Sequence, residues 1–134
     1  MAESSLIPDA AAPAGAAPAH AGFSSAAISP TGGSVTVALT GATGFIGRRL
    51  AAALAADGHR VRALTRRGGT GAAGIDWWPG DLSNADALRR LCAGADVVIH
   101  CAGAVRGATY DAFAAVNVRG TEALLAACAA EAPT

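Results

Sequence analysis

Three evenly spaced glycines near the first apolar run constrain the fold more than any other feature of the chain. The stretch VTVALTGATGFIGRRL, residues 35–50, places Gly41, Gly44 and Gly47 after a β-branched run and before a segment with helical periodicity. The apolar run predicts a buried strand, and the segment after it predicts a helix that stops near Gly58. A strand, a glycine loop and a helix in this order indicate an α/β fold.

The remaining chain repeats this alternation. The helix after the glycines is expected to bury one face made by Ile46, Leu50, Ala53 and Leu54. After it we expect a strand at 60–65, a loop at 68–74 and a strand within 75–81. A helix over 83–94, capped by Ser83 or Asn84, should follow, and then a strand within 96–103 and a helix over about 109–131. This order predicts a parallel sheet of strand order 3-2-1-4 with flanking helices, the first half of a Rossmann-type doubly wound fold.

The N-terminal segment reads differently from the rest. Residues 1–34 are dominated by alanine, proline, glycine and serine and show no period of a strand or helix. Such a segment buries too little apolar surface to offset its ordering entropy. We therefore predict a disordered tail at 1–34 and a single domain at 35–134.

Composition excludes several functions. The formal net charge is zero, all ten basic residues are arginines, and no lysine is present. This balance argues against a nucleic-acid partner, and the apolar runs are too short for a membrane span. The three cysteines, Cys92, Cys101 and Cys128, show no CxxC spacing and no metal-ligand pattern. They favour a structural role in a reduced, cytoplasmic setting.

The glycine spacing predicts a phosphate loop. Gly41 would let the chain turn sharply off the strand, Gly44 would let a pyrophosphate approach the backbone, and Gly47 would let the helix pack closely. The helix start adds N–H groups and a positive dipole end. The spacing is GxxGxxG, one residue longer in its first interval than the usual dinucleotide pattern.

With TGATGFIG, the chain resembles the extended short-chain dehydrogenase/reductase family, the NAD(P)-dependent epimerases and dehydratases. Three further motifs match in order: GDL at 80–82, HCAG at 100–103 and NVRGT at 117–121. The resemblance covers residues 35–134. It implies the cofactor-binding part of an epimerase, dehydratase or reductase-like oxidoreductase that acts on a nucleotide sugar or a small carbonyl compound.

The resemblance also implies a set of cofactor-binding residues. The pyrophosphate would be held by Gly41, Ala42, Thr43, Gly44, Phe45 and Ile46, the adenine by Asp81 and Leu82, and the ribose and nicotinamide by Cys101, Ala102, Gly103 and Asn117. Asp81 could instead be a turn residue or helix cap, and Asn117 could instead make a structural hydrogen bond. Phe45 could be a core residue whose backbone N–H still serves the phosphate.

The chain departs from the family pattern after its second strand. Thr65 stands where an NAD-preferring protein carries an acidic residue, and Arg66 and Arg67 follow it. Guanidinium groups pair with a 2′-phosphate, which a carboxylate would repel. Together with Arg48, this predicts NADP in preference to NAD, unless the arginine pair is simply solvated.

A second departure concerns catalysis. The family uses a tyrosine with a lysine four residues later, but Tyr110 is followed at that distance by Ala114. We therefore expect no catalytic residue in this chain and a sheet truncated before its fifth strand. A fragment of a longer enzyme, a non-catalytic cofactor-binding accessory or sensor module, and a scaffold domain remain open. Either self-association or a missing C-terminal half would cover the edge of the fourth strand.

Overall fold

The computed structural model describes residues 33–69, 71–106 and 109–131. The elements are β1 (Thr36–Thr40), α1 (Phe45–Ala56), β2 (Arg60–Thr65), β3 (Ile75–Pro79), α2 (Ala85–Cys92), β4 (Val97–His100), α3 (Tyr110–Ala114), the π-helical turn η1 (Ala115–Arg119) and α4 (Gly120–Glu131). The predicted disordered tail, residues 1–34, lies almost wholly outside the described residues.

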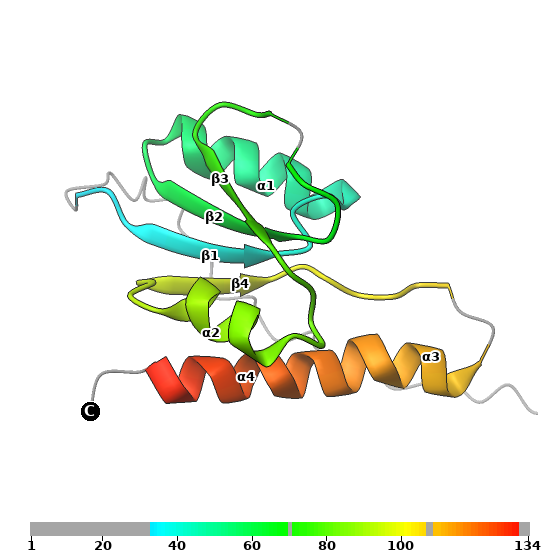
Figure 1. Ribbon diagram of the computed structural model, residues 1–134. Helices are drawn as coiled ribbons and strands as arrows, with labels where there is room; N and C mark the ends of the chain where they lie inside the picture. Colours follow the sequence, from blue (N-terminus) through cyan, green and yellow to red (C-terminus); the bar gives the residue numbers. More distant parts are fainter. Residues whose placement is uncertain (1–32, 70, 107–108, 132–134) are drawn as a thin grey trace, which may run out of the picture. The chain divides into compact units, whose positions relative to one another are not determined.

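The described strands form one parallel sheet in the predicted order, β3-β2-β1-β4. The order in which strands are added therefore reverses between β1 and β4, although all strands remain parallel, and α/β sheets of this kind bind their ligands at this position. Figure 1 shows α1 on one side of the sheet and α2 and α4 on the other. The predicted fold class is confirmed.

Successive residues of the central strand supply the two cores. Leu39 is buried beneath α1 with Val61 and Ala63 of β2, whereas Ala38 faces the opposite core with Leu88 and Leu124. Both faces of β1 are buried, since side chains alternate across a strand and helices cover both sides. This burial explains why the strand is a continuous apolar run.

Helix α1 packs through small residues, and its expected buried face was partly wrong. Gly47 and Ala51 are buried, and Leu50 and Leu54 pack against the same core. Ile46 instead is 69% exposed, and Ala53 is also exposed. Gly47 lies against the Gly41 backbone, and in this orientation of α1 the Ile46 side chain faces solvent. Hydrophobic spacing alone does not specify how a helix is rotated about its axis.

The predicted C-terminal helix is present but is not uniform. Helical residues run from Tyr110 to Glu131, with one π-helical turn at Ala115–Arg119. The Thr109 side chain caps its start by accepting a hydrogen bond of 3.2 Å from the Ala112 N–H. Turns of the π type are rare and occur frequently at functional sites.

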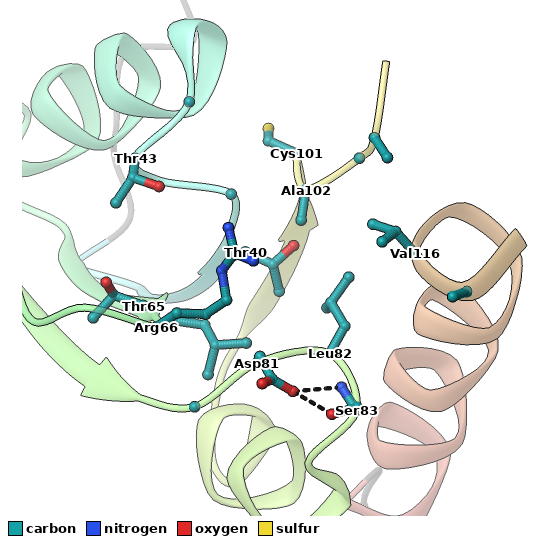
Figure 2. A pocket seen from close by; sticks show the side chains of 17 residues that line it. Thr40, Thr43, Thr65, Arg66, Asp81, Leu82, Ser83, Cys101, Ala102 and Val116 are labelled. Carbon is teal, nitrogen blue, oxygen red and sulfur yellow. Dashed lines mark hydrogen bonds between the residues drawn. The ribbon is translucent and has the colours of Figure 1, made fainter. Parts of the chain in front are cut away.

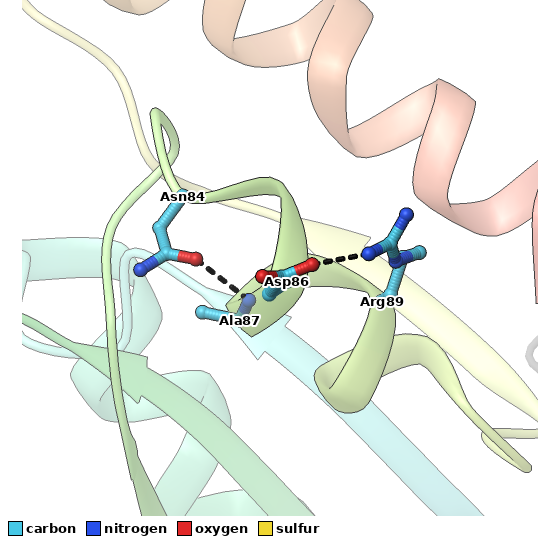
Figure 3. Close-up of polar contacts among 4 residues, drawn as sticks. All are labelled: Asn84, Asp86, Ala87 and Arg89. Atoms are coloured by element: carbon cyan, nitrogen blue, oxygen red, sulfur yellow. Dashed lines mark hydrogen bonds and ion pairs between the residues drawn. The ribbon is translucent and has the colours of Figure 1, made fainter.

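Helix α2 begins after Asn84, one of the two predicted caps. The side-chain oxygen of Asn84 accepts a hydrogen bond of 2.9 Å from the Ala87 N–H (Figure 3). Asp86 in the first turn forms an ion pair with Arg89. The cap and the acidic first turn stabilise the end of α2 that faces the carboxyl ends of the strands.

Candidate functional site

The carboxyl ends of the strands open into one cavity. The parallel register places Thr40 beside His100 and Thr65 beside Pro79, so the loops that follow these strands meet at one edge of the sheet. They enclose a cavity of about 580 Å³ (Figure 2). Its lining consists of Thr40, Gly41, Thr43, Gly44, Leu64, Thr65, Arg66, Gly80, Asp81, Leu82, Ser83, Cys101, Ala102, Gly103, Ala104, Ala115 and Val116.

Gly41 occupies a position that no other residue fits. Its φ is +75°, and a Cβ atom there would lie 2.4 Å from the Ala102 nitrogen. The Gly41 carbonyl then accepts a hydrogen bond of 2.9 Å from the Gly44 N–H. The predicted sharp turn is therefore present, and it also allows the β4 loop to approach closely.

Gly47 lets the start of α1 rest on this turn. A Cβ atom at Gly47 would lie 2.1 Å from the Gly41 carbonyl oxygen. The two glycines therefore make one contact, with the helix backbone pressed against the turn backbone. This contact sets where the N–H groups of α1 lie relative to the cavity.

Gly44 has a different environment. It is the N-cap of α1, with φ −78° and ψ 174°, and it lines the cavity. A Cβ atom there would meet only the Gly41 oxygen, at 3.2 Å. The first turn of α1 contains no acidic residue and no side-chain cap bond. Its backbone N–H groups and positive dipole end therefore suit an anion.

Of the arginines proposed for a 2′-phosphate, the structure brings one to the cavity. Arg66 is among the lining residues, whereas Arg48 and Arg67 are not. Figure 2 shows the Arg66 side chain reaching into the cavity. Buried Thr65, at the position of the expected acid, hydrogen-bonds its own turn instead, donating to the Gly68 carbonyl over 3.2 Å. The end of β2 therefore presents a positive charge to the cavity.

Asp81 holds the turn before α2 and also lines the cavity. One carboxylate oxygen accepts hydrogen bonds from Ser83, over 2.6 Å from the hydroxyl and 2.8 Å from the backbone N–H. These bonds, with a smaller contribution from the Arg66 charge, lower the pKa of the Asp81 carboxyl. Asp81 therefore organises the turn before α2 and also lines the cavity as a carboxylate.

A chain of hydrogen bonds behind the cavity links β1, β4 and α4. The Thr40 hydroxyl lies 2.6 Å from His100 Nδ1, and His100 Nε2 lies 3.1 Å from the Thr121 hydroxyl. Thr121 donates in turn to the Asn117 carbonyl over 2.9 Å. Since the Thr121 proton is used there, its oxygen accepts from Nε2–H, and Nδ1 accepts from Thr40. Burial lowers the pKa of His100, which agrees with this neutral tautomer.

Acidification is therefore expected to destabilise the chain through His100. The pKa of His100 is lowered on folding, so its contribution to the free energy of unfolding is complete above the ordinary histidine value of about 6.5 and is lost as the pH falls below it. Urea denaturation at a series of pH values should show a shallower decline for His100→Gln than for the parent chain. His59→Gln is the matched control, and equal slopes for the His100→Gln and parent chains would contradict the assignment.

Asn117 takes the structural role that was left open for it. Its side chain accepts a hydrogen bond of 2.7 Å from the Ala104 N–H and donates one of 2.9 Å to the Ala104 carbonyl. Asn117 itself is not among the lining residues, but Ala104 is. The π-helical turn therefore holds the loop after β4 in place through this pair of bonds.

The proposed site residues divide into two groups. The cavity is lined by Gly41, Thr43, Gly44, Arg66, Asp81, Leu82, Cys101, Ala102 and Gly103, and not by Ala42, Phe45, Ile46, Arg48, Arg67 and Asn117. Ala42 is instead a buried core residue. The backbones of Phe45 and Ile46 open α1, while their side chains are 74% and 69% exposed.

Sequence reasoning missed other lining residues, among them Thr40, Leu64, Gly80, Ser83, Ala104, Ala115 and Val116. Thr40 and Gly80 lie within the quoted motifs, and Ser83, Ala104 and Val116 directly adjoin a motif, so this position was the available signal. Ala115, in the π-helical turn, had no signal of its own. Among residues 33–69, 71–106 and 109–131, no cluster of three or more His, Cys, Asp or Glu side chains could hold a metal, and no helix is long and apolar enough to cross a membrane.

Comparisons with known proteins agree with this geometry. Residues 37–134 match the NAD dependent epimerase/dehydratase family. A ceramide reductase from Caulobacter vibrioides is 44% identical over 95 residues, covering 65% of this chain and 29% of that protein. A 2-alkyl-3-oxoalkanoate reductase from Stenotrophomonas maltophilia is 37% identical over 98 residues, covering 70% of this chain and 29% of that protein. The chain thus spans less than a third of the length of these relatives.

Solved structures are similar as well. A short-chain dehydrogenase/reductase superfamily protein from Agrobacterium tumefaciens with bound NAD is 34% identical, with a TM-score of 0.64 over 72% of this chain and 29% of that one. A mutant uronate dehydrogenase from the same organism, complexed with NAD, has a TM-score of 0.65 at 24% identity, over 74% of this chain and 38% of that one. The second likeness bears on the fold alone.

Proposed function

Because the chain belongs to the NAD dependent epimerase/dehydratase family, we propose that its cavity binds a nicotinamide dinucleotide. The observation that carries the proposal is the cavity itself, which joins the glycine loop after β1 to the loops after β2, β3 and β4. When bound, this cofactor supplies hydride transfer. The protein supplies binding, orientation and electrostatics, and the following paragraphs assign these to residues.

The glycine loop suits the pyrophosphate. The Gly44 backbone is exposed at the cavity with no side chain over it, and the first N–H groups of α1, from Phe45 onward, begin there. Two phosphates would meet unpaired donors and the positive end of the helix dipole. This cradle exists because Gly41 and Gly47 hold the loop and helix in contact.

The rest of the cavity fits the two nucleosides. Asp81 and Leu82 after β3 would flank the adenine, and residues 101–103 after β4 would follow the ribose and nicotinamide. A volume of about 580 Å³ falls within the usual range of roughly 300–1,000 Å³ for small-molecule sites. The residues present therefore fit a dinucleotide.

We further propose that Arg66 makes this site bind NADP in preference to NAD. Its side chain lines the cavity beside the end of β2, where the adenosine ribose would lie, and Thr65 offers no carboxylate there. Replacing Arg66 with Asp is expected to weaken NADPH binding by roughly tenfold to a hundredfold, since a charge-assisted contact contributes about 1.5–3 kcal/mol. NADH binding should change little or improve.

The matched control is Arg67→Asp. This substitution makes the same change of charge one residue later, but Arg67 does not line the cavity. The variant should therefore retain most of the preference for NADPH over NADH. Isothermal titration calorimetry with NADPH and NADH on the three proteins distinguishes these outcomes. Equal affinities for both cofactors in the parent chain would count against Arg66 as the selecting residue.

For the whole protein we propose a reductase acting on a carbonyl compound. Two similar curated proteins are named as reductases, ceramide reductase and 2-alkyl-3-oxoalkanoate reductase, and this supports reduction over epimerisation or dehydration. The substrate would approach the nicotinamide side of the cavity, beyond residues 101–103.

A non-catalytic NAD(P)-binding accessory or sensor module is the second candidate. The observation that favours it is the position of Tyr110, which is 82% exposed and lies outside the lining of the cavity among the described residues. Sustained oxidation of NADPH by this chain with small carbonyl substrates would exclude the second candidate.

The direct test of dinucleotide binding is calorimetry on the full chain with NADPH and NADH, with adenosine as a control ligand that lacks the pyrophosphate. We expect saturable binding of a dinucleotide and much weaker binding of adenosine. Failure of both dinucleotides to bind a chain that melts cooperatively would overturn the proposed function.

A further inference from the structure

Two of the three cysteines meet across the helical layer that covers one face of the sheet. Cys92 is the last residue of α2 and Cys128 lies in the second half of α4. Their sulfur atoms are 3.7 Å apart, although the residues are 36 positions apart in the sequence. Cys92 is 4% exposed, whereas Cys128 is only partly buried at the edge of the same apolar cluster.

This pair lies apart from the cofactor cavity. Ser83, just before α2, lines that cavity, and α2 then runs away from it to end at Cys92. Likewise α4 starts at Gly120, which approaches Leu82 of the cavity, and continues beyond Cys128 to Glu131. Figure 1 shows the two helices on the same side of the sheet. The thiols therefore have no part in the binding site.

We propose that Cys92 and Cys128 are a redox-modification site, a dithiol that a low-molecular-weight disulfide such as glutathione disulfide converts into an intramolecular disulfide. The geometry requires the sulfur atoms to close from 3.7 Å to the bonded distance of about 2.05 Å. Cys92 ends its helix, so a small change of its side-chain torsion and of the helix end supplies this movement.

The reaction proceeds by two thiol–disulfide exchanges. The partly exposed Cys128 loses its proton and attacks one sulfur of glutathione disulfide, which forms a mixed disulfide and releases one glutathione. The Cys92 thiol then loses its proton and attacks the Cys128 sulfur, which releases the second glutathione. Two protein thiols are oxidised to one disulfide, and one glutathione disulfide is reduced to two thiols.

The burial of Cys92 determines which of the two thiols reacts first. Desolvation, reinforced by the neighbouring Cys128, raises the pKa of Cys92 to about 12. Cys92 is therefore a poor first nucleophile, and Cys128 reacts first. The same burial makes Cys92 a poor leaving group, because a thiolate of high pKa departs slowly. The disulfide is accordingly expected to form slowly and to resist reduction by small thiols.

The test is a thiol count on the full chain. The fully reduced protein has three thiols, Cys92, Cys101 and Cys128. After incubation with glutathione disulfide under conditions where circular dichroism shows a folded chain, the reaction is quenched with acid, denatured and alkylated. We expect one alkylated cysteine per monomer, Cys101, and a protein two hydrogen atoms lighter than the reduced form.

The matched variants are Cys101→Ser and Cys128→Ala. Cys101→Ser should form the same disulfide and retain no thiol, whereas Cys128→Ala should retain both of its thiols. Three thiols remaining in the parent chain, a glutathione adduct on Cys128 without closure, or a disulfide that includes Cys101 would each overturn the proposal.

Discussion

The Gly47→Val chain is expected to be largely unfolded. A Cβ atom at this position would lie 2.1 Å from the Gly41 carbonyl oxygen and 2.7 Å from the Gly41 carbonyl carbon. Both partners are backbone atoms, so neither can rotate away, and α1 would have to lift off the turn. Overpacking a core typically costs about 1–3 kcal/mol even where side chains can adjust. A rigid backbone clash exceeds that, against a total stability of about 5–15 kcal/mol for ordinary domains.

Urea denaturation followed by circular dichroism measures this effect. Gly33→Val is the matched control, since Gly33 has no left-handed φ and a Cβ there would meet nothing within 4 Å. It should unfold at the same urea concentration as the parent chain. Gly47→Ala should already be severely destabilised, because Cβ itself makes the clash. A Gly47→Val chain with the parent midpoint would show that the helix does not rest on the turn.

Sequence patterns were sufficient for the centre of the sheet because both faces of β1 and β2 are buried. The strand at Arg60–Thr65 was predicted with the bounds observed, and its inner residues Val61 and Leu64 are buried on opposite sides of the sheet. Short strands with apolar residues on both faces have few alternatives. The glycine loop was predictable for a related reason, since only glycine fits the φ of +75° at Gly41.

The helices and the site were less predictable, because contacts between distant residues decide them. The exposure of Ile46 follows from how closely Gly47 approaches the turn, and alanine-rich segments give little hydrophobic contrast between helix faces. The π-helical turn at Ala115–Arg119 has no sequence signal in composition or spacing. The pairing of Cys92 with Cys128 likewise depends on how α2 and α4 pack.

The arginines illustrate the same limit within the site. Arg48 follows the glycine loop, Arg66 and Arg67 follow the second strand, and sequence alone makes all three candidates for the 2′-phosphate. Only Arg66 lines the cavity, because the turn after β2 is held by Thr65 through the Gly68 carbonyl and the Arg67 N–H. A charged residue suggested by the sequence is thus weak evidence for a contact with the cofactor until the position of its backbone is known.

Gly44→Val is expected to abolish dinucleotide binding while leaving the chain folded. Its φ of −78° and ψ of 174° suit a β-branched residue, and its Cβ would meet only the Gly41 oxygen, at 3.2 Å. The valine methyl groups would instead cover the backbone at the start of α1, where we propose that the pyrophosphate binds. The affinity for NADPH should fall at least about a hundredfold, which corresponds to roughly 2.7 kcal/mol.

Calorimetry with NADPH and a urea titration on the same preparation separate binding from folding. Gly44→Ala should weaken binding less than Gly44→Val, because a single methyl group covers less of the loop, and Gly33→Val should bind like the parent chain. A loss of binding that tracks a loss of stability across these variants would indicate unfolding as its cause. A folded Gly44→Val chain with unchanged NADPH affinity would place the pyrophosphate elsewhere, because no dinucleotide could then approach the backbone that this side chain covers.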